Sequence, residues 1–318
     1  NYMSNSKRPK AFFLNGGMGR IISAIPALEK YYESKEDPDF IIVIEGISNM
    51  MNGHPTLDNK TYDMYHKNLF HTKLINMDIV SPEPYRLNEY FNQKCDIAQA
   101  FDILINKKGI RELPAPTLVL SKEELLEGRK AVDEIKKKVK KEKLVIVQPF
   151  GRAITQIDNS FIDKTNRSIE FGNLKNIIKK LQEKDWAVCI MAEFGIEFKD
   201  AGFKDEVAIP EIGDLRNWAG LIKYADAFLG CDSVGQHLAK AMETPASVVM
   251  GATYPINTSY PNDKSFKIID MGQFDREYDP IRISFDERIS RKHERIMSMT
   301  PDIEDYVVSA VNGDPIEE

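Results

Sequence analysis

The first half of the chain alternates short apolar runs with segments of helical period. The apolar runs are typical of buried strands in a parallel sheet, and the residues between them repeat at three and four positions, as in an amphipathic helix. Pro26, inside the first helical segment, predicts either a first turn or a kink. The segment 46–87 shows no clear pattern. The predicted elements are strands at 11–14 and 40–44 and helices at 20–32 and 88–104.

The second half repeats this alternation. Ser121 and Glu124 have the spacing of a capping box and predict a helix at 122–140. We interpret its lysine-rich end as a solvated helix end rather than as a phosphate-binding site. Strands that alternate with helices predict an α/β fold with a parallel sheet in each half. The later elements are strands at 144–147, 187–191, 227–230 and 246–250 and helices at 171–182, 215–224, 233–242 and 300–311.

Length and composition favour a globular protein of two domains. The chain has 318 residues, and a domain takes roughly 150 residues. The predicted division is a first domain at 1–141, a second at 142–295 and a C-terminal helix at 296–318 that packs back across the cleft. The net charge of −6 does not indicate a nucleic-acid-binding protein by itself.

The cysteines and the apolar runs bear on the cellular compartment. Cys95, Cys189 and Cys231 are odd in number and far apart, which argues against a disulfide framework. No apolar run is long enough to span a membrane. We therefore expect a reduced cytoplasmic protein without stable membrane insertion.

A glycine-rich turn follows the first predicted strand. Gly16, Gly17 and Gly19 stand between this strand and a helix, and Arg20 comes next. Glycines let backbone amides approach a phosphate closely, and a helix N-terminus favours negative charge. The spacing is not the dinucleotide-binding fingerprint, whose third glycine falls later. The turn is predicted either to bind anionic oxygens of a donor or to be a plain tight turn.

Two arginines flank the loop after the first strand of the second half. Gly151 and Arg152 follow that strand closely, and Arg167 stands at the end of a long polar loop. The planar guanidinium fork suits phosphate oxygens. These three residues are candidates for donor binding, with plain exposure of the arginines as the alternative.

The segment 230–241 combines a strand end with a helix start. A predicted strand ends at Cys231, and Asp232 and Ser233 are typical N-cap residues. His237 lies one turn further along, on the same side as Ser233. This arrangement predicts a pocket for phosphates and hydroxyls, with a histidine buried against the sheet as the alternative. The candidate donor-binding residues here are Asp232, Ser233, Gly235, Gln236 and His237.

Other reaction classes lack supporting motifs. No group of histidines and cysteines has metal-ligand spacing, and the one Asp-x-Asp motif considered, at 37–39, has the composition of a turn before a strand. No Gly-x-Ser-x-Gly elbow occurs, which argues against a Ser-His-Asp hydrolase. We expect no metal and no cofactor, and no protein partner is evident.

Together the motifs resemble the heptosyltransferase-like enzymes of glycosyltransferase family 9. The most specific is Asp-Ser-Gly-x-x-His-x-x-x-Ala, which is met from Asp232 to Ala241 with Val234 in the glycine place. The similarity covers most of residues 11–255. The other matching stretches are 17–20 and 26–28 at the first helix, 116–120 before the linker, 167–170 at a helix start and the loop 250–255.

The resemblance implies the GT-B fold, with two Rossmann-like domains facing a central cleft. It implies an acceptor site in the first domain and a nucleotide-sugar site in the second, and inverting transfer to a hydroxyl without a metal. Arg167 takes the place of a phosphate-binding lysine. The nucleoside is expected near Met191, Glu193 and Ile212, at strand ends of the second domain.

One departure concerns the catalytic base. The family's proposed base is an aspartate in its opening motif, and Arg20 holds that place here. A guanidinium stays charged and does not deprotonate a hydroxyl. We predict that Arg20 stabilises anionic oxygens, with a structural ion pair as the alternative. Glu45 is the first candidate for the base, and His54 and Asp58 follow; each of the three has a loop-capping alternative.

The acceptor stays open between two classes. The stretches 83–90 and 253–257 resemble divergent members from tailed bacteriophages, which suggests hydroxymethylated DNA as the acceptor. A lipopolysaccharide-core glycan is the other candidate. The aromatic residues of 62–91 are predicted to line a DNA groove or to form a core cluster.

Two other functions remain as alternatives. One is a GT-B-like sugar-nucleotide epimerase, and the other is a non-catalytic module that binds a nucleotide sugar. The sequence determines neither the base nor the sugar of the donor, and it does not determine the oligomeric state.

Overall fold

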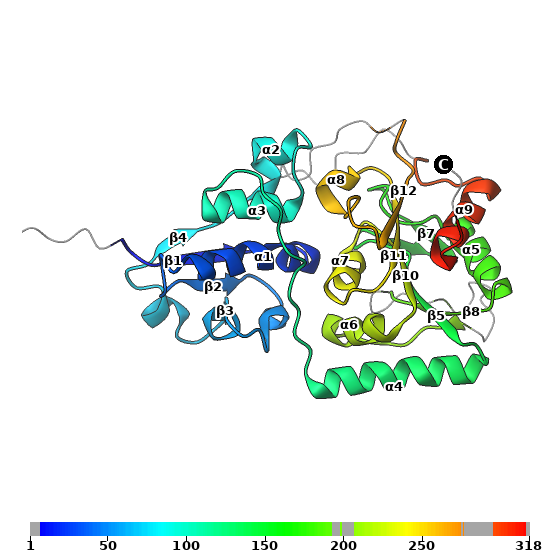
Figure 1. The fold of residues 1–318 in the computed structure, drawn as a ribbon, viewed down its shortest axis with the longest axis horizontal. Coiled ribbons are helices and arrows are strands. Elements are labelled where there is room, and N and C mark those ends of the chain that lie inside the picture. The colour runs from blue at the N-terminus through cyan, green and yellow to red at the C-terminus, as the bar shows by residue number, and fades with distance from the viewer. Residues whose placement is uncertain (1–6, 193–197, 199–206, 275, 277–294, 316–318) are drawn as a thin grey trace, which may run out of the picture. The chain divides into compact units, whose positions relative to one another are not determined.

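The computed structural model describes residues 7–192, 198, 207–274, 276 and 295–315. The chain divides into two compact units, 1–119 and 120–318, and each unit is built around its own parallel sheet (Figure 1). This boundary precedes the predicted one at 141/142, because helix α4 (Lys122–Val139) packs against α6 (Leu215–Tyr224) of the second unit. The binding roles predicted for the two domains stay predictions.

The first unit contains a four-stranded parallel sheet in the order β3-β2-β1-β4. Its central strands are the predicted apolar runs, and every residue of β2 is buried. The edge strands are only three residues long, so they show no period in the sequence. The strands are β1 (Lys10–Leu14), β2 (Ile41–Ile44), β3 (Thr61–Asp63) and β4 (Asp78–Val80).

The predicted helix at 88–104 is wrong in its middle. The structure has α2 (Asn88–Phe91) and then α3 (Ile97–Asn106), because Gln93 takes a positive φ of 53° and Asp96 starts a new helix with a capping box. Helix α1 (Met18–Ser34) packs against α3. Pro26 lies in the interior of α1, so it does not mark the first turn. Short helical turns occur at Asn49–Met51, Asp58–Lys60, Leu69–Lys73 and Pro84–Arg86.

The second unit contains a six-stranded parallel sheet in the order β12-β11-β10-β5-β8-β9. Taken in chain order within the unit, this is 6-5-4-1-2-3, the doubly wound order of Rossmann-like domains. The first sheet has the same 3-2-1-4 arrangement. The strands are β5 (Lys143–Gln148), β8 (Trp186–Ile190), β9 (Val207–Ala208), β10 (Ala227–Cys231), β11 (Ala246–Met250) and β12 (Phe266–Asp270).

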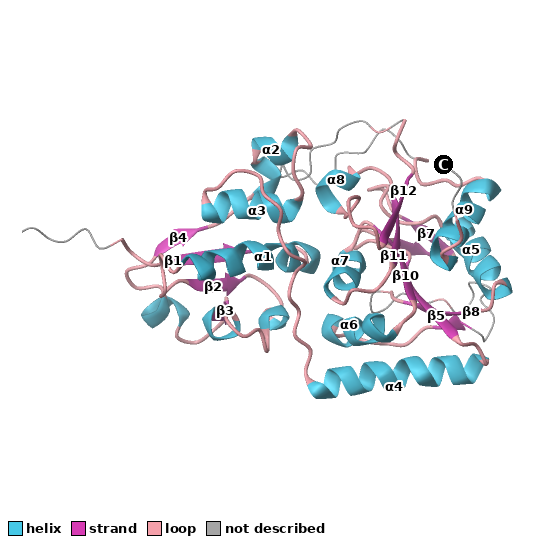
Figure 2. Cartoon of the chain, viewed as in Figure 1, coloured by secondary structure: helices cyan, strands magenta, loops and turns pink. Residues whose placement is uncertain are grey.

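Helices cover both faces of the second sheet (Figure 2). Helix α7 (Val234–Ala241) packs on β10 and β11 and against α6, whereas α9 (Pro301–Asn312) packs on the same strands and against α5 (Phe171–Glu183). A short α8 (Pro255–Thr258) follows β11. The packing of the C-terminal helix across a cleft stays a prediction. Inside the predicted polar loop lies an antiparallel hairpin, β6 (Thr155–Ile157) and β7 (Ser160–Ile162).

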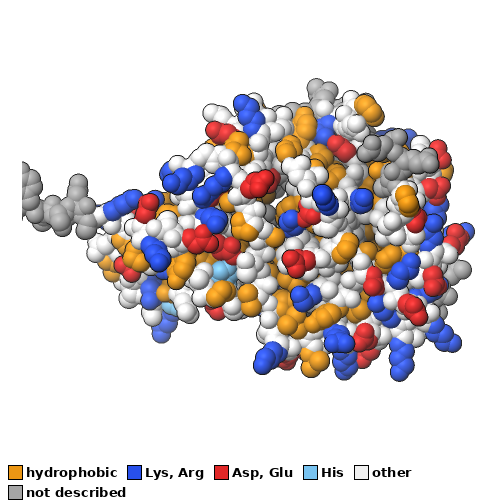
Figure 3. Space-filling view, viewed as in Figure 1, with side chains coloured by type: hydrophobic (Ala, Val, Ile, Leu, Met, Phe, Trp, Pro, Cys, Tyr) orange, Lys and Arg blue, Asp and Glu red, His pale blue; other side chains and the backbone are white. Residues whose placement is uncertain are grey.

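Helix α4 lies along the lower edge of the view, and its surface carries charged side chains of both signs (Figure 3). Two lysines near its end form ion pairs: Lys136 with Asp226 at 2.7 Å and Lys141 with Asp185 at 2.6 Å. These pairs agree with a structural role for this lysine-rich segment. No helix within the described ranges is both long and apolar enough to cross a membrane.

Helix α4 crosses α6 at a contact between two glycines. A Cβ on Gly128 would lie 2.4 Å from the Gly220 carbonyl carbon, and one on Gly220 would lie 2.7 Å from the Glu124 carbonyl oxygen. Beside this contact Arg216 forms a bidentate pair with Glu124, with Nε–Oε1 and Nη2–Oε2 distances of 2.7 and 2.9 Å. This hydrogen bonding lowers the pKa of Glu124. The two interactions fix α4 to the second unit.

We expect Gly128→Ala to destabilise the protein by about 1–3 kcal/mol, because its methyl group would meet the backbone of α6, which cannot move as a side chain can. Gly172→Ala in α5 is the matched control, since nothing lies within 4 Å of its added Cβ. The control should keep or raise the urea midpoint, because alanine favours helix. Equal midpoints for the two variants would contradict the close crossing.

Candidate functional site

The carboxyl edge of the second sheet has one topological switch point, between β5 and β10. The chain after β5 returns to the sheet at β8 on one side, and the chain after β10 returns at β11 on the other. The two connections diverge from neighbouring strand ends, which is the topology at which doubly wound sheets bind ligands.

Gln148, the last residue of β5, holds the two sides of the switch point together. Its Nε2 donates to Ser233 Oγ at 3.2 Å, and its Oε1 accepts from the Gly235 N–H at 2.8 Å. A Cβ on Gly235 would lie 2.4 Å from that Oε1, so the position requires glycine. The Ser233 side chain makes no capping bond to α7. The N-terminus of α7, with its partial positive charge, is therefore fixed at the strand ends.

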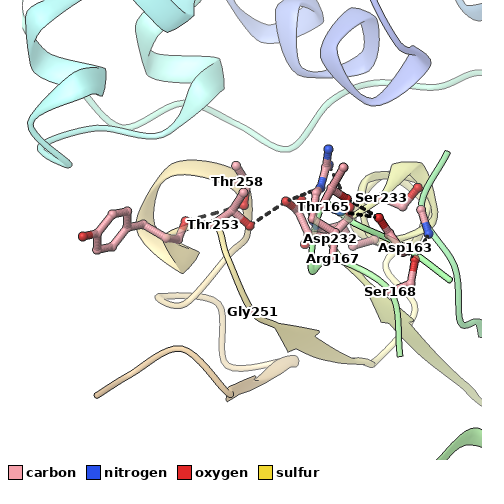
Figure 4. A network of polar contacts seen from close by, with 12 residues as sticks. Asp163, Thr165, Arg167, Ser168, Asp232, Ser233, Gly251, Thr253 and Thr258 are labelled. Atoms are coloured by element: carbon pink, nitrogen blue, oxygen red, sulfur yellow. Dashed lines mark hydrogen bonds and ion pairs between the residues drawn. The ribbon is translucent and has the colours of Figure 1, made fainter. Parts of the chain in front are cut away.

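Asp232 lies at the centre of a polar network that joins three loops (Figure 4). Its side chain is only 3% exposed. Its Oδ2 accepts from Thr253 Oγ1 at 2.6 Å and lies 3.2 Å from Arg167 Nε, while Oδ1 accepts from Gln236 Nε2 at 3.2 Å. Arg167 Nη2 also donates to the Asp232 carbonyl oxygen at 2.9 Å. A buried carboxylate needs such partners, and here they set the position of the arginine.

The loop that carries Arg167 is tied down on both sides. Ser168 Oγ accepts from the Gly151 N–H at 2.9 Å and donates to Asp163, which also accepts from the Thr165 N–H at 2.8 Å. The Ala252 N–H donates to the carbonyl of Asn166 at 3.2 Å. These bonds hold the loop against the ends of β5 and β11. The partly exposed guanidinium of Arg167, with a side chain 35% exposed, therefore has a fixed position beside α7.

His237 is buried in the second turn of α7. Its Nδ1 forms a hydrogen bond with the Tyr260 hydroxyl at 2.6 Å. Burial lowers its pKa to about 4, with a smaller opposing effect of Asp232 and a smaller lowering effect of Arg167. The histidine is therefore neutral at physiological pH and packs as part of the core, which was the alternative to a direct ligand contact. Gln236, fully buried beside it, has no partner for Oε1 within the described residues.

The structure thus joins most of the predicted donor-binding residues of the second unit. Gly151, Arg167, Asp232, Ser233 and Gly235 share one network, which also includes Gln236. Their predicted contact with a donor stays a prediction.

Among the described residues, no hydrogen bond or ion pair joins Arg152, Met191 or Ile212 to this network. Arg152 is exposed. Met191 is buried next to β5, where its N–H donates to the Val147 carbonyl at 2.8 Å. Ile212 is partly buried, and its carbonyl accepts from Trp218 Nε1 at 3.2 Å. Glu193 lies outside the described residues.

Arg20 forms the ion pair that was the alternative to its predicted role. It is buried at the start of α1, and its Nη1 lies 2.8 Å from Glu83 Oε1. The nearby Gly16 and Gly17 form the turn between β1 and α1, in which Gly16 has a φ of 92°, and Gly19 lies in the first turn of α1. A Cβ on Gly17 would meet nothing within 4 Å. Ligand binding by these three glycines and catalysis by Arg20 stay predictions.

The candidates for the catalytic base occupy separate places. His54 is buried: its Nε2 lies 2.8 Å from Glu29 Oε1, and its Nδ1 accepts from the N–H groups of Thr56 and Leu57. Asp58 accepts from the Gly53 N–H at 2.8 Å, as a loop-capping residue does. Glu45 is exposed just after β2. Among described residues, no side-chain hydrogen bond or ion pair joins any two of Arg20, Glu45, His54 and Asp58.

The aromatic residues of 62–91 differ widely in their exposure to solvent. Tyr90 is 4% exposed and packs edge-on against Tyr85, whereas Tyr65 and Phe70 are 82% and 63% exposed. Core packing therefore accounts for some of these rings. A DNA groove lined by the others stays a prediction.

Several residues of the network were not among the predicted ones. Gln148 ends strand β5 and Thr253 follows β11 closely, and a polar residue at the end of a buried strand is the signal that would have singled them out. Asp163 and Ser168 lie in a loop without a pattern. No group of three or more metal-ligating side chains occurs in the part of the chain that the structure describes.

Comparison with solved structures defines the class of fold. A glycosyltransferase of family 9 from Veillonella parvula superposes with a TM-score of 0.65 at 12% identity, over 98% of each chain. The Escherichia coli ADP-heptose lipopolysaccharide heptosyltransferase II gives 0.62 at 12% identity, over 96% of this chain and 98% of that one.

A third structure agrees with these two. The iron-containing dodecameric glycosyltransferase TibC of Escherichia coli gives a TM-score of 0.60 at 11% identity, over 96% of this chain and 79% of that one. No protein-family model matches the sequence, and a search of the curated proteins finds no match. The expected resemblance is thus confirmed for the fold: both units have the parallel α/β architecture found in these glycosyltransferases.

We expect the stability of the protein to fall between pH 6.5 and pH 4 in part through His237. Its pKa is about 4 in the folded state, against about 6.5 in the unfolded chain. The unfolded state therefore binds the proton first as the pH falls, and the contribution of neutral His237, up to about 3 kcal/mol, is present above pH 6.5 and is lost toward pH 4.

Urea unfolding at several pH values measures this effect. His237→Gln should lose less stability than the wild type across the same interval, because its side chain does not titrate. His71→Gln is the matched control, since this histidine is exposed, and it should keep the wild-type slope. Identical slopes for wild type and His237→Gln would disprove the assignment.

Proposed function

We propose that this protein is a glycosyltransferase that moves a sugar from a nucleoside-diphosphate sugar to a hydroxyl group. The observation that carries the proposal is the network at the switch point of the second sheet. There the N-terminus of an eight-residue helix and the anchored guanidinium of Arg167 stand next to each other. Both favour the charge of a diphosphate leaving group.

The proposed donor site lies in the second unit. The diphosphate contacts Arg167 and the first turn of α7, with Ser233 and Gly235 at its edge. Asp232 acts through Arg167, because its own carboxylate is buried and already holds three side chains. The nucleoside extends past Met191 and Ile212 along the strand ends. Preorganised positive charge of this kind stabilises a leaving diphosphate without a metal ion.

The donor sugar and the acceptor are proposed by class only. The heptosyltransferase II neighbour takes ADP-heptose, which makes an ADP-linked sugar the first donor to test. We propose inversion at the anomeric carbon. Hydroxymethylated DNA and a lipopolysaccharide-core glycan remain the two acceptor classes, and the proposed phage origin goes with the first of them. We propose a cytoplasmic location with either acceptor, which is the host cytoplasm if a phage encodes the protein.

Arg167→Ala should weaken binding of a nucleoside diphosphate about 10- to 100-fold, because a charge-assisted hydrogen bond contributes roughly 1.5–3 kcal/mol. Titration calorimetry with ADP, UDP, GDP and CDP measures this and identifies the base. Arg129→Ala on the exposed surface of α4 is the matched control and should keep wild-type affinity. Unchanged affinity in Arg167→Ala would exclude the proposed donor site.

Transfer assays separate the proposed function from its alternatives. Incubation with the donor that binds, together with hydroxymethylcytosine DNA or lipopolysaccharide core, should release the nucleoside diphosphate and give a glycosylated product. An epimerase would convert the donor alone into its epimer. A non-catalytic module would bind the donor and leave it unchanged with every acceptor.

A further inference from the structure

The carboxyl edge of the first sheet also has a switch point, and a pair of charged residues stands there. The edge belongs to β1 and its neighbour β4, which are parallel. Helix α1 starts shortly after β1, with Arg20 in its first turn, and Glu83 follows β4 by a few residues. Crevices at such strand ends are where parallel sheets place substrates.

Arg20 is held rigidly in this place. Its side chain is 4% exposed, and its Nη2 donates to the Pro82 carbonyl at 3.2 Å. The guanidinium lies over the rings of Tyr85 and Phe101, at 5.1 and 5.5 Å from their centroids. Contact with two aromatic faces offsets part of the cost of burying the cation. Arg20 is therefore a fixed, buried cation next to Glu83.

Glu83 is the partly exposed member of the pair. Its Oε1 accepts from Arg20 Nη1 at 2.8 Å and from the Tyr85 N–H at 3.3 Å. Its Oε2 accepts only a longer bond of 3.3 Å from Arg20 Nη2 within the described residues. The Glu83 side chain is 33% exposed. One carboxylate oxygen is thus oriented by its partner and still has lone pairs open to a substrate hydroxyl.

Three other carboxylates of the first unit each lack one of these properties. Glu45 is exposed but makes no side-chain hydrogen bond or ion pair with any described residue. Asp58 is already used by the Gly53 N–H, and the carboxylate of Glu29 is paired with His54. Glu83 alone among these combines partial exposure with a buried cation that fixes it.

We propose that Glu83 is the general base of this protein and that Arg20 is its positioning residue. The inference rests on the proposed function. The acceptor oxygen forms a bond to the anomeric carbon while the bond from that carbon to the diphosphate oxygen breaks. The electron pair of the broken bond leaves with the nucleoside diphosphate. The acceptor proton passes to Glu83 Oε2 and then to solvent, so that atoms and charge balance.

Three variants test the base. Glu83→Gln keeps the size of the side chain but does not accept the proton, and kcat should fall about 100- to 10,000-fold. Glu83→Asp keeps the ion pair and retracts the carboxylate by about 1.5 Å, and kcat should fall about 100-fold. Glu112→Gln is the matched control, since it removes an exposed carboxylate of the same unit that has no proposed role, and it should keep wild-type activity.

Further readouts distinguish a base from a structural ion pair. In the wild type, kcat/KM should fall tenfold per pH unit on the acid side, and Glu83→Gln should lose this limb. Sodium formate should restore part of the activity of Glu83→Ala, whose shortened side chain leaves room for an external base. The affinity for the nucleoside diphosphate should stay at the wild-type value in all Glu83 variants.

The outcomes separate the inference from the proposed function. If the wild type transfers sugar and folded Glu83→Gln or Glu83→Asp transfers it equally fast, Glu83 is not the base and the proposed function stands. If Glu83→Asp folds and loses activity but the acid limb survives in Glu83→Gln and formate does not rescue Glu83→Ala, the pair is structural. If the wild type transfers no sugar from any donor that it binds, both proposals fail.

Discussion

The buried carboxylate of Asp232 is the constraint on which the second unit's site depends. A charge with a side chain only 3% exposed requires partners, and these come from two loops and a helix: Arg167 after β5, Thr253 after β11 and Gln236 in α7. Removal of one partner would leave the charge uncompensated, so the loops stay together. The same contacts put a guanidinium and a helix N-terminus at one switch point, which is what a diphosphate requires.

The first unit shows the reverse arrangement of charge at the equivalent place in its sheet. There the buried group is the cation of Arg20 and the partly exposed group is the carboxylate of Glu83. In both units a buried charge fixes a partner of opposite sign that reaches solvent. An anchored cation suits a leaving diphosphate, whereas an anchored carboxylate suits the proton of a hydroxyl nucleophile.

Much of the fold could be predicted because local pattern and tertiary burial agree in the second unit. The predicted strand at 246–250 and helix at 215–224 have the observed bounds. The capping box at Ser121 and Glu124 is present. Prediction was poor at 46–87, because strands of only three residues show no periodic pattern of apolar side chains. It was also poor at 88–104, because the break at Gln93 depends on a backbone conformation that the spacing of apolar residues does not reveal.

The sequence by itself determined the α/β class, the two halves and the strand-to-helix turns that hold Asp232 and Arg20, because strands, caps and glycine turns depend on neighbours along the chain. Only the tertiary structure decided which charges meet. Glu83 reaches Arg20, Arg167 reaches Asp232 and Gln148 reaches Gly235 across separations that no local spacing encodes. Those pairings follow from the order of the strands in each sheet, which brings distant strand ends to one edge.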